Sequence, residues 1–343
     1  MESEIVLKTD RLSIGYQTRQ RGFSNILENI NLTCYQSELI ALIGENGSGK
    51  STLLKTLSRL FPFNSGEILF RNKLELVDII NFSRKDFAKK LSFVSTEIIK
   101  VENLRVFDVV ALGRFPYTNW FGSLSEIDIE IINHSIDLVG LNHFKDKNIN
   151  EISDGERQKV LIARSLAQDT EIIILDEPTA FLDLPNRYEL ICLLGILAKE
   201  KRKTIVFSTH DLNLALKEAD KIWLMLDKDI LEGAPEDLIL NETFNHIFEN
   251  SSLNFDKLKG DFRIKRKHDI KIGLTGDGIY YTWTKKALER MNFSVEKGNE
   301  SIHFITLELV NESCVWKYTN QIESVVFNTI YDLSKYLKFQ VRI

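Results

Sequence analysis

Residues 37–60 read SELIALIGENGSGKSTLLKTLSRL, and this stretch decides the fold. It joins an apolar run of strand length to a glycine-rich segment, Gly44–Thr52, and then to leucines at helical spacing. The pattern predicts a buried strand, a tight turn and a helix, in that order. Further apolar runs follow at 171–178, 203–211 and 221–226, separated by longer amphipathic stretches. Continuous apolar strands between helices favour a parallel sheet that is covered on both faces.

The glycine-rich segment matches G-x-x-x-x-G-K-[ST], in its required place between a strand and a helix. Glycines are needed because backbone N–H groups must close on the phosphates of a nucleotide, and side chains would block them. Lys50 would reach the phosphates as a point charge, Ser51 would bind Mg²⁺, and the helix N-terminus would add its dipole. The predicted nucleotide site takes in the whole segment: Gly44, Glu45, Asn46, Gly47, Ser48, Gly49, Lys50, Ser51 and Thr52.

Composition and charge exclude several classes of protein. The chain has 343 residues, 43% hydrophobic and 27% charged, which is ordinary globular composition and long enough for two or three domains. Its net charge of −5 gives no electrostatic case for nucleic acid as a partner. Three widely spaced cysteines fit neither a disulfide framework nor a metal cluster, so we expect a reducing compartment. We see no export signal and no apolar run of about 18 residues, so the chain itself is not expected to span a membrane.

The expected fold is α/β: a P-loop NTPase core with an antiparallel β layer and a helical subdomain, plus a small C-terminal α+β domain. The first domain is expected to cover 1–255, and its opening residues alternate like antiparallel strands with one wet face. From about 82 to 150 the pattern predicts a helical insertion between the first and second core strands. Residues 256–268, rich in Lys and Arg, are expected to form a solvated linker. The small domain is predicted over 269–343, with 324–337 as its closing helix.

Two other predicted core strands end in residues that could act on a nucleotide. The run IIIL is followed by Asp176 and Glu177, and the run TIVF by STHD with His210. Because the carboxyl ends of parallel strands meet at one edge of a sheet, these residues are expected beside the glycine loop. Asp176 would hold Mg²⁺, Glu177 would act as general base for an attacking water, and His210 would contact the γ-phosphate or orient that water. The alternatives are a solvated loop for the two acids and a structural role for the histidine.

Residues 151–158, EISDGERQ, allow two interpretations. Ser153 and Glu156 are spaced as a capping box, the ordinary start of a helix. The free N–H groups of that helix start could also hold an anion. Asp154, beside Gly155, places a carboxylate where an anion site would not be expected to have one.

With these motifs in order, residues 4–255 resemble the ATP-binding subunits of ABC transporters. The resemblance implies that ATP is the nucleotide and that Tyr16 stacks on adenine. It identifies EISDGERQ as the family signature, so that Ser153 and Gly155 of one copy would close over the ATP of the other in a head-to-tail homodimer. It also implies that AFLD, which ends at Asp183, is the loop that crosses between the two subunits.

The chain departs from the family pattern at two positions. Asp154 stands where the family has the first of two glycines, and we expect the signature to be weakened but working. FVST ends at Thr96 where the family usually has a glutamine that contacts Mg²⁺ and the attacking water. A threonine hydroxyl could bind Mg²⁺, but it is shorter.

Residues 106–122, VFDVVALGRFPYTNWFG, and the run HDLNLALKEAD from His210 resemble importers of iron–siderophores, haem and cobalamin. This resemblance implies an ATP-hydrolysing subunit that works with membrane permease subunits and an extracytoplasmic substrate-binding protein, at the cytoplasmic face of the inner membrane. The aromatic residues Phe115, Tyr117, Trp120 and Phe121 would suit a cleft for a permease helix, or could pack internally.

Two other functions stay open from the sequence. One is a soluble ABC protein that acts as a nucleotide switch in DNA repair or translation, although the coiled-coil insertion or second cassette usual in such proteins is not seen. The other is a regulatory nucleotide-binding module with little turnover. The sequence assigns no chemistry to the small C-terminal domain.

Overall fold

The computed structural model describes residues 4–18, 22–73, 75–95, 103–119, 122–180, 182–244, 253–256, 260–264, 270–310 and 313–340. The chain forms two compact units. The first unit comprises Met1–Asn250 with Phe255–Asp261, and the second comprises Ser251–Asn254 with Phe262–Ile343.

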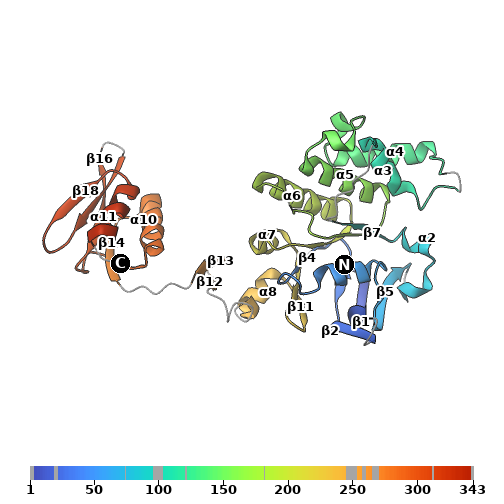
Figure 1. Cartoon of the computed structure of the whole chain (residues 1–343), viewed down its shortest axis with the longest axis horizontal. Coiled ribbons are helices and arrows are strands. Elements are labelled where there is room, and N and C mark those ends of the chain that lie inside the picture. The colour runs from blue at the N-terminus through green and yellow to red at the C-terminus, as the bar shows by residue number, and fades with distance from the viewer. Residues whose placement is uncertain are drawn as a thin grey trace. The chain divides into compact units, whose positions relative to one another are not determined.

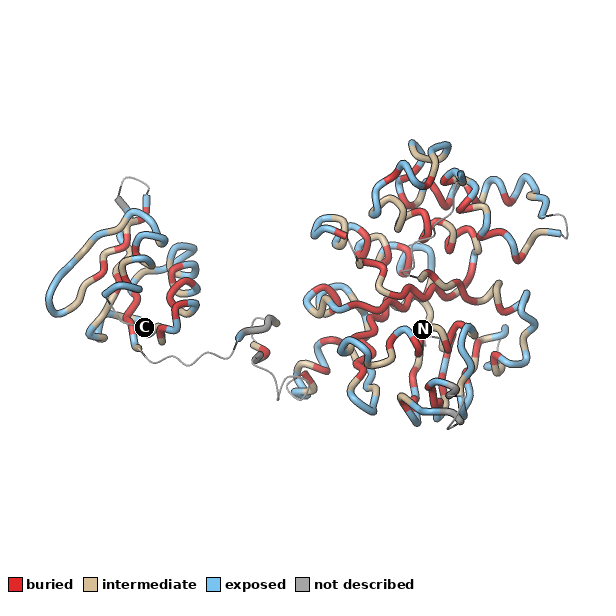
Figure 2. The backbone as a smooth tube through the Cα atoms, in the orientation of Figure 1, coloured by how far each residue is buried: buried red, intermediate tan, exposed pale blue. Residues whose placement is uncertain are grey.

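A six-stranded sheet lies at the centre of the first unit. Its strand order is β11 (Ile230–Gly233), β10 (Lys221–Met225), β4 (Leu39–Ile43), β9 (Thr204–Ser208), β8 (Ile172–Leu175) and β7 (Leu91–Val94). All neighbours are parallel except β11, which runs antiparallel to β10. Strands β4, β8 and β9 are buried along their whole length and form the continuous buried band of Figure 2. Strands that are covered on both faces have this uniformly apolar sequence.

An antiparallel layer covers one side of this sheet. It comprises β1 (Ile5–Thr18), β2 (Gly22–Ile30), β3 (Thr33–Tyr35), β5 (Ser65–Asn72) and β6 (Glu75–Asp78). Helix α1 (Lys50–Leu57) buries Leu53, Leu54 and Leu57 in one hydrophobic core shared by the layer and the sheet. Each of these leucines contributes roughly 1.5–3 kcal/mol by its burial.

Helices lie on the other side of the sheet (Figure 1). The outermost group is α3 (Val106–Ala111), α4 (Glu126–Leu138) and α5 (Asp154–Ala167), which pack against one another. In the described part of the first unit, α6 (Leu184–Glu200), α7 (Leu212–Glu218), α2 (Arg84–Phe87) and α8 (Pro235–Leu240) are further helices, of which α2 and α8 lie nearer the antiparallel layer in Figure 1. Short 3₁₀ turns are η1 (Ile79–Asn81), η2 (Leu112–Arg114), η3 (Asn142–Phe144) and η4 (Ile149–Glu151).

The assignment of 82–150 to a helical insertion is wrong at β7. Residues Leu91–Val94 pair in parallel with β8 and form the edge of the central sheet. A four-residue apolar run between two helical patterns is too short for periodicity to separate strand from helix. This segment forms a strand because it pairs with β8, about eighty residues later, and the local sequence pattern does not show that pairing.

The second unit is a mixed sheet with helices on it. The strand order is β15 (Phe293–Lys297), β14 (Ile270–Thr275), β16 (Phe304–Val310), β17 (Ser313–Thr319) and β18 (Ser324–Phe327). The first three are parallel, and β17 and β18 are antiparallel to their neighbours. Helices α10 (Gly278–Arg290) and α11 (Ile330–Gln340) pack into its own hydrophobic core.

Two expectations for the C-terminal part are wrong in detail. The predicted closing helix over 324–337 begins only at Ile330, because Ser324–Phe327 pairs with β17 as β18. The predicted linker over 256–268 contains a strand, since β12 (Leu253–Asp256) and β13 (Asp261–Ile264) form a two-stranded sheet. Both segments are short, and neither has the length at which a helical or strand period is distinctive.

Candidate functional site

The glycine loop, residues 44–49, joins β4 to α1 and curls around the side chain of Lys50. Lys50 Nζ donates to the carbonyl oxygens of Gly44 and Glu45, at 2.8 and 2.9 Å. Gly47 and Gly49 have φ angles of +82° and +106°, which side chains other than glycine rarely permit. The loop can therefore follow this course only with glycine at both positions.

The start of α1 is arranged to receive an anion. No side chain caps the helix, so the free N–H groups of its first turn are available to a ligand. Ser48 Oγ is also buried, and among the described residues it has no hydrogen-bond partner. A buried hydroxyl without a partner is unfavourable unless a ligand or water completes it. Phosphate oxygens would satisfy both sets of groups.

Lys50 is buried beside two carboxylates. Burial lowers the pKa of Lys50, and the charges of Glu177 and Asp176 act in the opposite direction. Phosphates close to Nζ would favour the charged ammonium in the same way as the carboxylates do. Lys50 is therefore placed to pair, as a charged ammonium, with a bound polyanion.

Tyr16 projects from β1 of the antiparallel layer beside the same helix start. Its hydroxyl lies 2.7 Å from Thr52 Oγ1, and 53% of the residue is exposed. Thr52 itself is buried. The hydrogen bond thus holds an exposed aromatic ring next to the glycine loop.

Asp176 follows β8 and faces the helix start from the neighbouring strands. Ser51 Oγ donates to Asp176 Oδ1 at 3.1 Å, and Ser208 Oγ, at the end of β9, donates to the same oxygen at 2.9 Å. Hydroxyl and carboxylate oxygens are the donors that Mg²⁺ prefers. The side chains of Ser51 and Asp176 therefore fit a magnesium ion at the edge of the sheet.

Glu177 and His210 form a pair at this edge. His210 Nε2 lies 2.6 Å from Glu177 Oε1. The backbone of Glu177 has φ +47°, an uncommon value for this residue, and its N–H donates to Ser208 Oγ at 2.7 Å. A pocket of about 160 Å³ adjoins the pair, with Thr209 among the residues that line it. His210 contacts Oε1 of Glu177, so the other carboxylate oxygen, Oε2, takes no part in this contact.

The sequence interpretation missed Ser208. This buried serine accepts from the Glu177 N–H and donates to Asp176, so it links the two acids to the end of β9. The available signal was its place in STHD, immediately after an apolar strand and two residues before His210. Sequence alone gave no reason to prefer it over a buried polar residue of the core.

In EISDGERQ the capping box is present. Ser153 accepts from the Glu156 N–H at 3.3 Å, and Glu156 Oε2 accepts from the Ser153 N–H at 2.7 Å. Asp154 is turned toward Arg157, whose Nη1 lies 2.7 Å from Asp154 Oδ1. Arg157 also donates to the carbonyl of Ile152, at 3.3 Å. The unexpected carboxylate therefore has a cation as its neighbour, a partner that the sequence interpretation did not name.

Asp183 caps α6 in a similar way. Its Oδ1 accepts from the backbone N–H and side-chain amide of Asn186, at 3.1 and 2.6 Å. A Cβ added at Gly155 would lie 3.5 Å from Asn186 Cγ, so Asn186 lies between the start of α5 and Asp183. Ser153 and Asp183 make these hydrogen bonds within the starts of their own helices, with Glu156 and Asn186. Thr96 lies outside the described residues.

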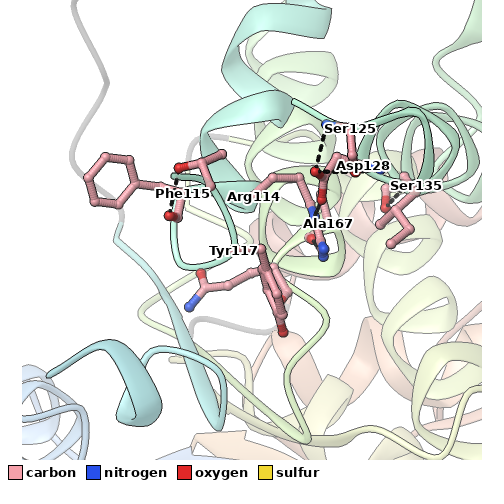
Figure 3. A network of polar contacts seen from close by, with 10 residues as sticks. Arg114, Phe115, Tyr117, Ser125, Asp128, Ser135 and Ala167 are labelled. Carbon is pink, nitrogen blue, oxygen red and sulfur yellow. Dashed lines mark hydrogen bonds and ion pairs between the residues drawn. The ribbon is translucent and has the colours of Figure 1, made fainter. Parts of the chain in front are cut away.

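A buried ion pair supports the loop that follows α3 (Figure 3). Arg114 Nε lies 2.7 Å from Asp128 Oδ1 at the start of α4, and Arg114 Nη1 donates to the carbonyl of Ala167 at the end of α5. Asp128 also accepts from the backbone N–H and hydroxyl of Ser125. Arg114 therefore joins the ends of three elements.

The aromatic residues of this loop have different environments. Phe115 points away from the Arg114 network and is 75% exposed (Figure 3). Tyr117 packs instead, with Arg114 Cζ 3.8 Å from its ring centroid and its hydroxyl donating to the Gln168 carbonyl. Trp120 and Phe121 lie outside the described residues. A pocket of about 700 Å³ has Phe115 on its wall; its other lining residues are Arg84, Lys85, Ala88, Pro116, Thr118, Asn119 and Gly122.

Comparison with known proteins identifies both parts of the chain. Residues 27–180 match the family "ABC transporter", and residues 269–338 match the family "Iron ABC transporter C-terminal domain". An uncharacterized ABC transporter ATP-binding protein of Methanocaldococcus jannaschii is 42% identical over 76% of this chain and 87% of its own length. A petrobactin import ATP-binding protein of Bacillus anthracis is 36% identical, over 71% of this chain and 86% of its own length.

The chain belongs to the ABC transporter ATP-binding proteins. A solved metal-chelate type ABC transporter in an inward-facing conformation is 26% identical and superimposes with a TM-score of 0.62, over 76% of this chain and 96% of the matched chain. These findings confirm the expected ABC-type ATPase and its fold class. In the part of the chain that the structure describes, every helix of this ABC ATPase falls short of the length or apolarity that a membrane span requires.

Proposed function

We propose that this ABC ATPase hydrolyses ATP to drive import of an iron–siderophore or related metal chelate through a separate membrane permease. The match of residues 269–338 to an iron-transporter domain and the similarity to a petrobactin import protein support this cargo class. The observation that carries the ATPase proposal is the meeting of the glycine loop with Asp176, Glu177 and His210 at one sheet edge. The soluble-switch alternative is not favoured, because these similarities are to transporter proteins.

The residues divide the chemistry between binding and proton transfer. The loop N–H groups, Lys50 and the Ser48 hydroxyl bind the phosphates, and the Tyr16 ring stacks on adenine. Ser51 and Asp176 would hold Mg²⁺, which would neutralise part of the phosphate charge when it is bound. A contact of Thr96 with that ion stays a prediction.

Glu177 takes the proton of the attacking water. With its proton on Nε2, His210 donates to Glu177 Oε1, which leaves Oε2 to accept from water. The hydrogen bond from the Glu177 N–H to Ser208 fixes the backbone of Glu177 beside Ser51 and Asp176, the proposed magnesium ligands. His210 thus orients the base, and it would also contact the γ-phosphate of a bound nucleotide.

The complete site requires two copies of the chain. Ser153 and Gly155 lie at the start of α5, and Asp183 lies at the start of α6. In a head-to-tail homodimer these residues would close over the nucleotide of the partner. Opening and closing of this dimer would be passed to the permease. The groove beside Phe115 would receive a helix of the permease.

The wider assembly follows from the same proposal. An importer of this kind takes its cargo from an extracytoplasmic substrate-binding protein, and the ATPase lies at the cytoplasmic face of the inner membrane. Isolation of the complex from membranes should yield permease subunits and a metal chelate. Recovery of ribosomal or DNA-repair proteins instead would contradict the transport proposal.

The ATPase step is tested by Glu177→Gln. Because the amide cannot accept the proton, kcat should fall by about a hundredfold or more while ATP still binds. ATP turnover and nucleotide binding would both be measured, with Glu200→Gln at the exposed end of α6 as the control. If the wild type is no faster than Glu177→Gln, with or without permease, the chain is a nucleotide-binding module without turnover.

A further inference from the structure

Helix α10 of the second unit presents two apolar and two basic side chains to solvent. Ile279, Trp283, Lys286 and Arg290 follow at spacings of four, three and four, which places them on one stripe of the helix. Ile279 and Trp283 are 68% and 55% exposed. Lys286 Nζ lies 4.5 Å from the centroid of the Trp283 ring. The stripe is opposite the buried side of the helix, which carries Leu288.

Helix α11 presents a second stripe of the same kind. Tyr331, Lys335 and Phe339 are spaced four residues apart, and all three are exposed. The exposed fractions of Tyr331 and Phe339 are 76% and 78%. Leu333 and Leu337 on the opposite side of the helix are buried in the core of the unit.

The two stripes belong to one surface. Helices α10 and α11 contact each other, and α10 packs on β14 and β15 while α11 packs on β17 and β18. Their buried sides face the same core, so their exposed sides form the outer surface of one helical layer. In Figure 2 the buried residues of α10 lie on its sheet side. This surface therefore combines large apolar side chains with basic ones.

The charge of the layer differs in sign from that of the whole chain. The chain carries −5, but α10 has three basic residues and one acidic residue, and α11 has two and one. The acidic residues lie outside the stripes. Glu289 lies 3.9 Å from Lys285, and Asp332 accepts from the Thr329 hydroxyl at the start of α11. Within these two described helices, the stripes themselves have basic charge only.

We propose that the α10–α11 surface binds the anionic surface of a lipid bilayer. Aromatic side chains suit the level of the lipid headgroups, and each lysine or arginine near an anionic membrane strengthens binding roughly fivefold. A second copy of this chain fits less well, because a two-fold contact would place the same basic stripes against each other. A membrane also matches stripes that combine large exposed apolar side chains with basic ones.

The inference concerns lipid alone and stands apart from the proposed transport function. Vesicles without permease test it directly, so a failure here would leave the ATPase and transport proposals untouched. The full chain would be sedimented with vesicles of phosphatidylcholine, and with vesicles of equal parts phosphatidylcholine and phosphatidylglycerol. We expect binding to the anionic vesicles only, with release at high salt.

Matched charge reversals assign the binding to this surface. Lys286→Glu with Lys335→Glu should weaken binding to anionic vesicles by at least about tenfold. Lys297→Glu with Lys317→Glu makes the same change in net charge on the sheet and should leave binding unchanged. Trp283 emission should shift to the blue on binding, and Trp283→Phe should remove that component.

Three results would overturn the proposal. The first is an absence of binding by the wild type to anionic vesicles. The second is an equal loss in the helix and sheet variants, because binding would then follow net charge alone. The third is a change of the helix variant from dimer to monomer without vesicles, since a second copy would then occupy this surface.

Discussion

At the scale of single residues, Ser208 shows how the site is held. Its hydroxyl accepts from the backbone N–H of Glu177 and donates to Asp176, so one buried oxygen orients both acids. The uncommon backbone angle of Glu177 makes such support necessary, because this conformation persists only where the surroundings impose it.

Ser208→Ala should therefore lower the rate of ATP hydrolysis by more than its loss of stability explains. The change leaves the Glu177 N–H without a partner, at a cost of about 1–3 kcal/mol in the free energy of unfolding. We expect kcat for ATP hydrolysis to fall about tenfold or more, because Glu177, the proposed base, and Asp176, the proposed magnesium ligand, lose their shared hydrogen-bond partner. Ser165→Ala removes a comparable buried hydroxyl, which bonds to the Ile162 carbonyl within α5, and is the control. Equal kcat values for the two variants would show that Ser208 has only a structural role.

Asp154 is the residue at which the chain departs most visibly from its family. Its pairing with Arg157 offsets the charge of this carboxylate, whereas a glycine would leave the Arg157 guanidinium without its ion-pair partner beside the helix start. Asp154→Gly should leave the free energy of unfolding within about 1 kcal/mol of wild type, because the carboxylate is exposed. It should lower the ATP concentration for half-maximal activity by up to about fivefold.

A substitution of Arg157 should have the opposite effect on the ATP concentration for half-maximal activity. Arg157→Gln should raise that ATP concentration, since the carboxylate then loses its neutralising partner. Steady-state ATPase assays over a range of ATP concentrations would measure both variants. A large loss of activity in Asp154→Gly would show that the carboxylate has a positive role in the closed dimer.

At the scale of elements, the Arg114–Asp128 pair holds the helical group together. The hydroxyl of Ser125 lowers the pKa of Asp128, assisted by the Ser125 N–H and by Arg114. A carboxylate with a lowered folded-state pKa contributes stability that is present above its unfolded pKa, near 3.9, and is lost as pH falls through the folded value.

Asp128→Asn should therefore destabilise the chain in a pH-dependent way. At neutral pH, loss of one member of a buried pair should cost roughly 3–5 kcal/mol in the free energy of unfolding. The difference from wild type should shrink as pH falls below the unfolded pKa, near 3.9, because the unfolded carboxyl then binds a proton and the folded one, with its lowered pKa, does so only at still lower pH. Urea unfolding at several pH values would measure this. The exposed Asp146→Asn serves as the control, and a constant difference at all pH values would contradict the assignment.

A substitution in the loop after α3 tests the proposed contact with the permease. Phe115→Asp places a charge on the wall of the groove that we propose for the permease. The permease should then be lost on co-purification, because a charged side chain replaces the apolar one on the wall of the pocket. The melting temperature of the isolated chain should hardly change, since Phe115 is 75% exposed. Tyr117→Phe, a change to a packed neighbour, should retain the permease, and loss in both variants would place the effect on the loop as a whole.

At the scale of the whole molecule, the chain has two units with separate hydrophobic cores. Calorimetry of the full chain should show two unfolding transitions. A nucleotide at about a hundred times its Kd should raise only the transition of the first unit, by about 2.7 kcal/mol of added stability. Leu333→Ala, in the core of the second unit, should lower only the other transition, by about 2–5 kcal/mol. A single transition that responds to both changes would show that the units unfold together.

The sequence by itself determined the P-loop core, the places of the main buried strands along the chain and the presence of a second unit. Residues 37–60 carry all three signals of the loop within one local stretch: an apolar strand, glycines and a helix. Local backbone preference and period were enough there, because every necessary contact lies within a few residues. The positions of Asp176, Glu177 and His210 followed from the rule that parallel strands end at one edge.

Only the tertiary structure decided the contacts between distant segments. Strand β7 exists because Leu91–Val94 pairs with β8, and Ser208 matters because it reaches Glu177 thirty-one residues earlier. At Asp154 the sequence placed a carboxylate beside an expected anion site, and only the structure shows that Arg157 pairs with it. Side-chain direction and strand pairing depend on packing across the whole unit, so a local pattern contains no record of them.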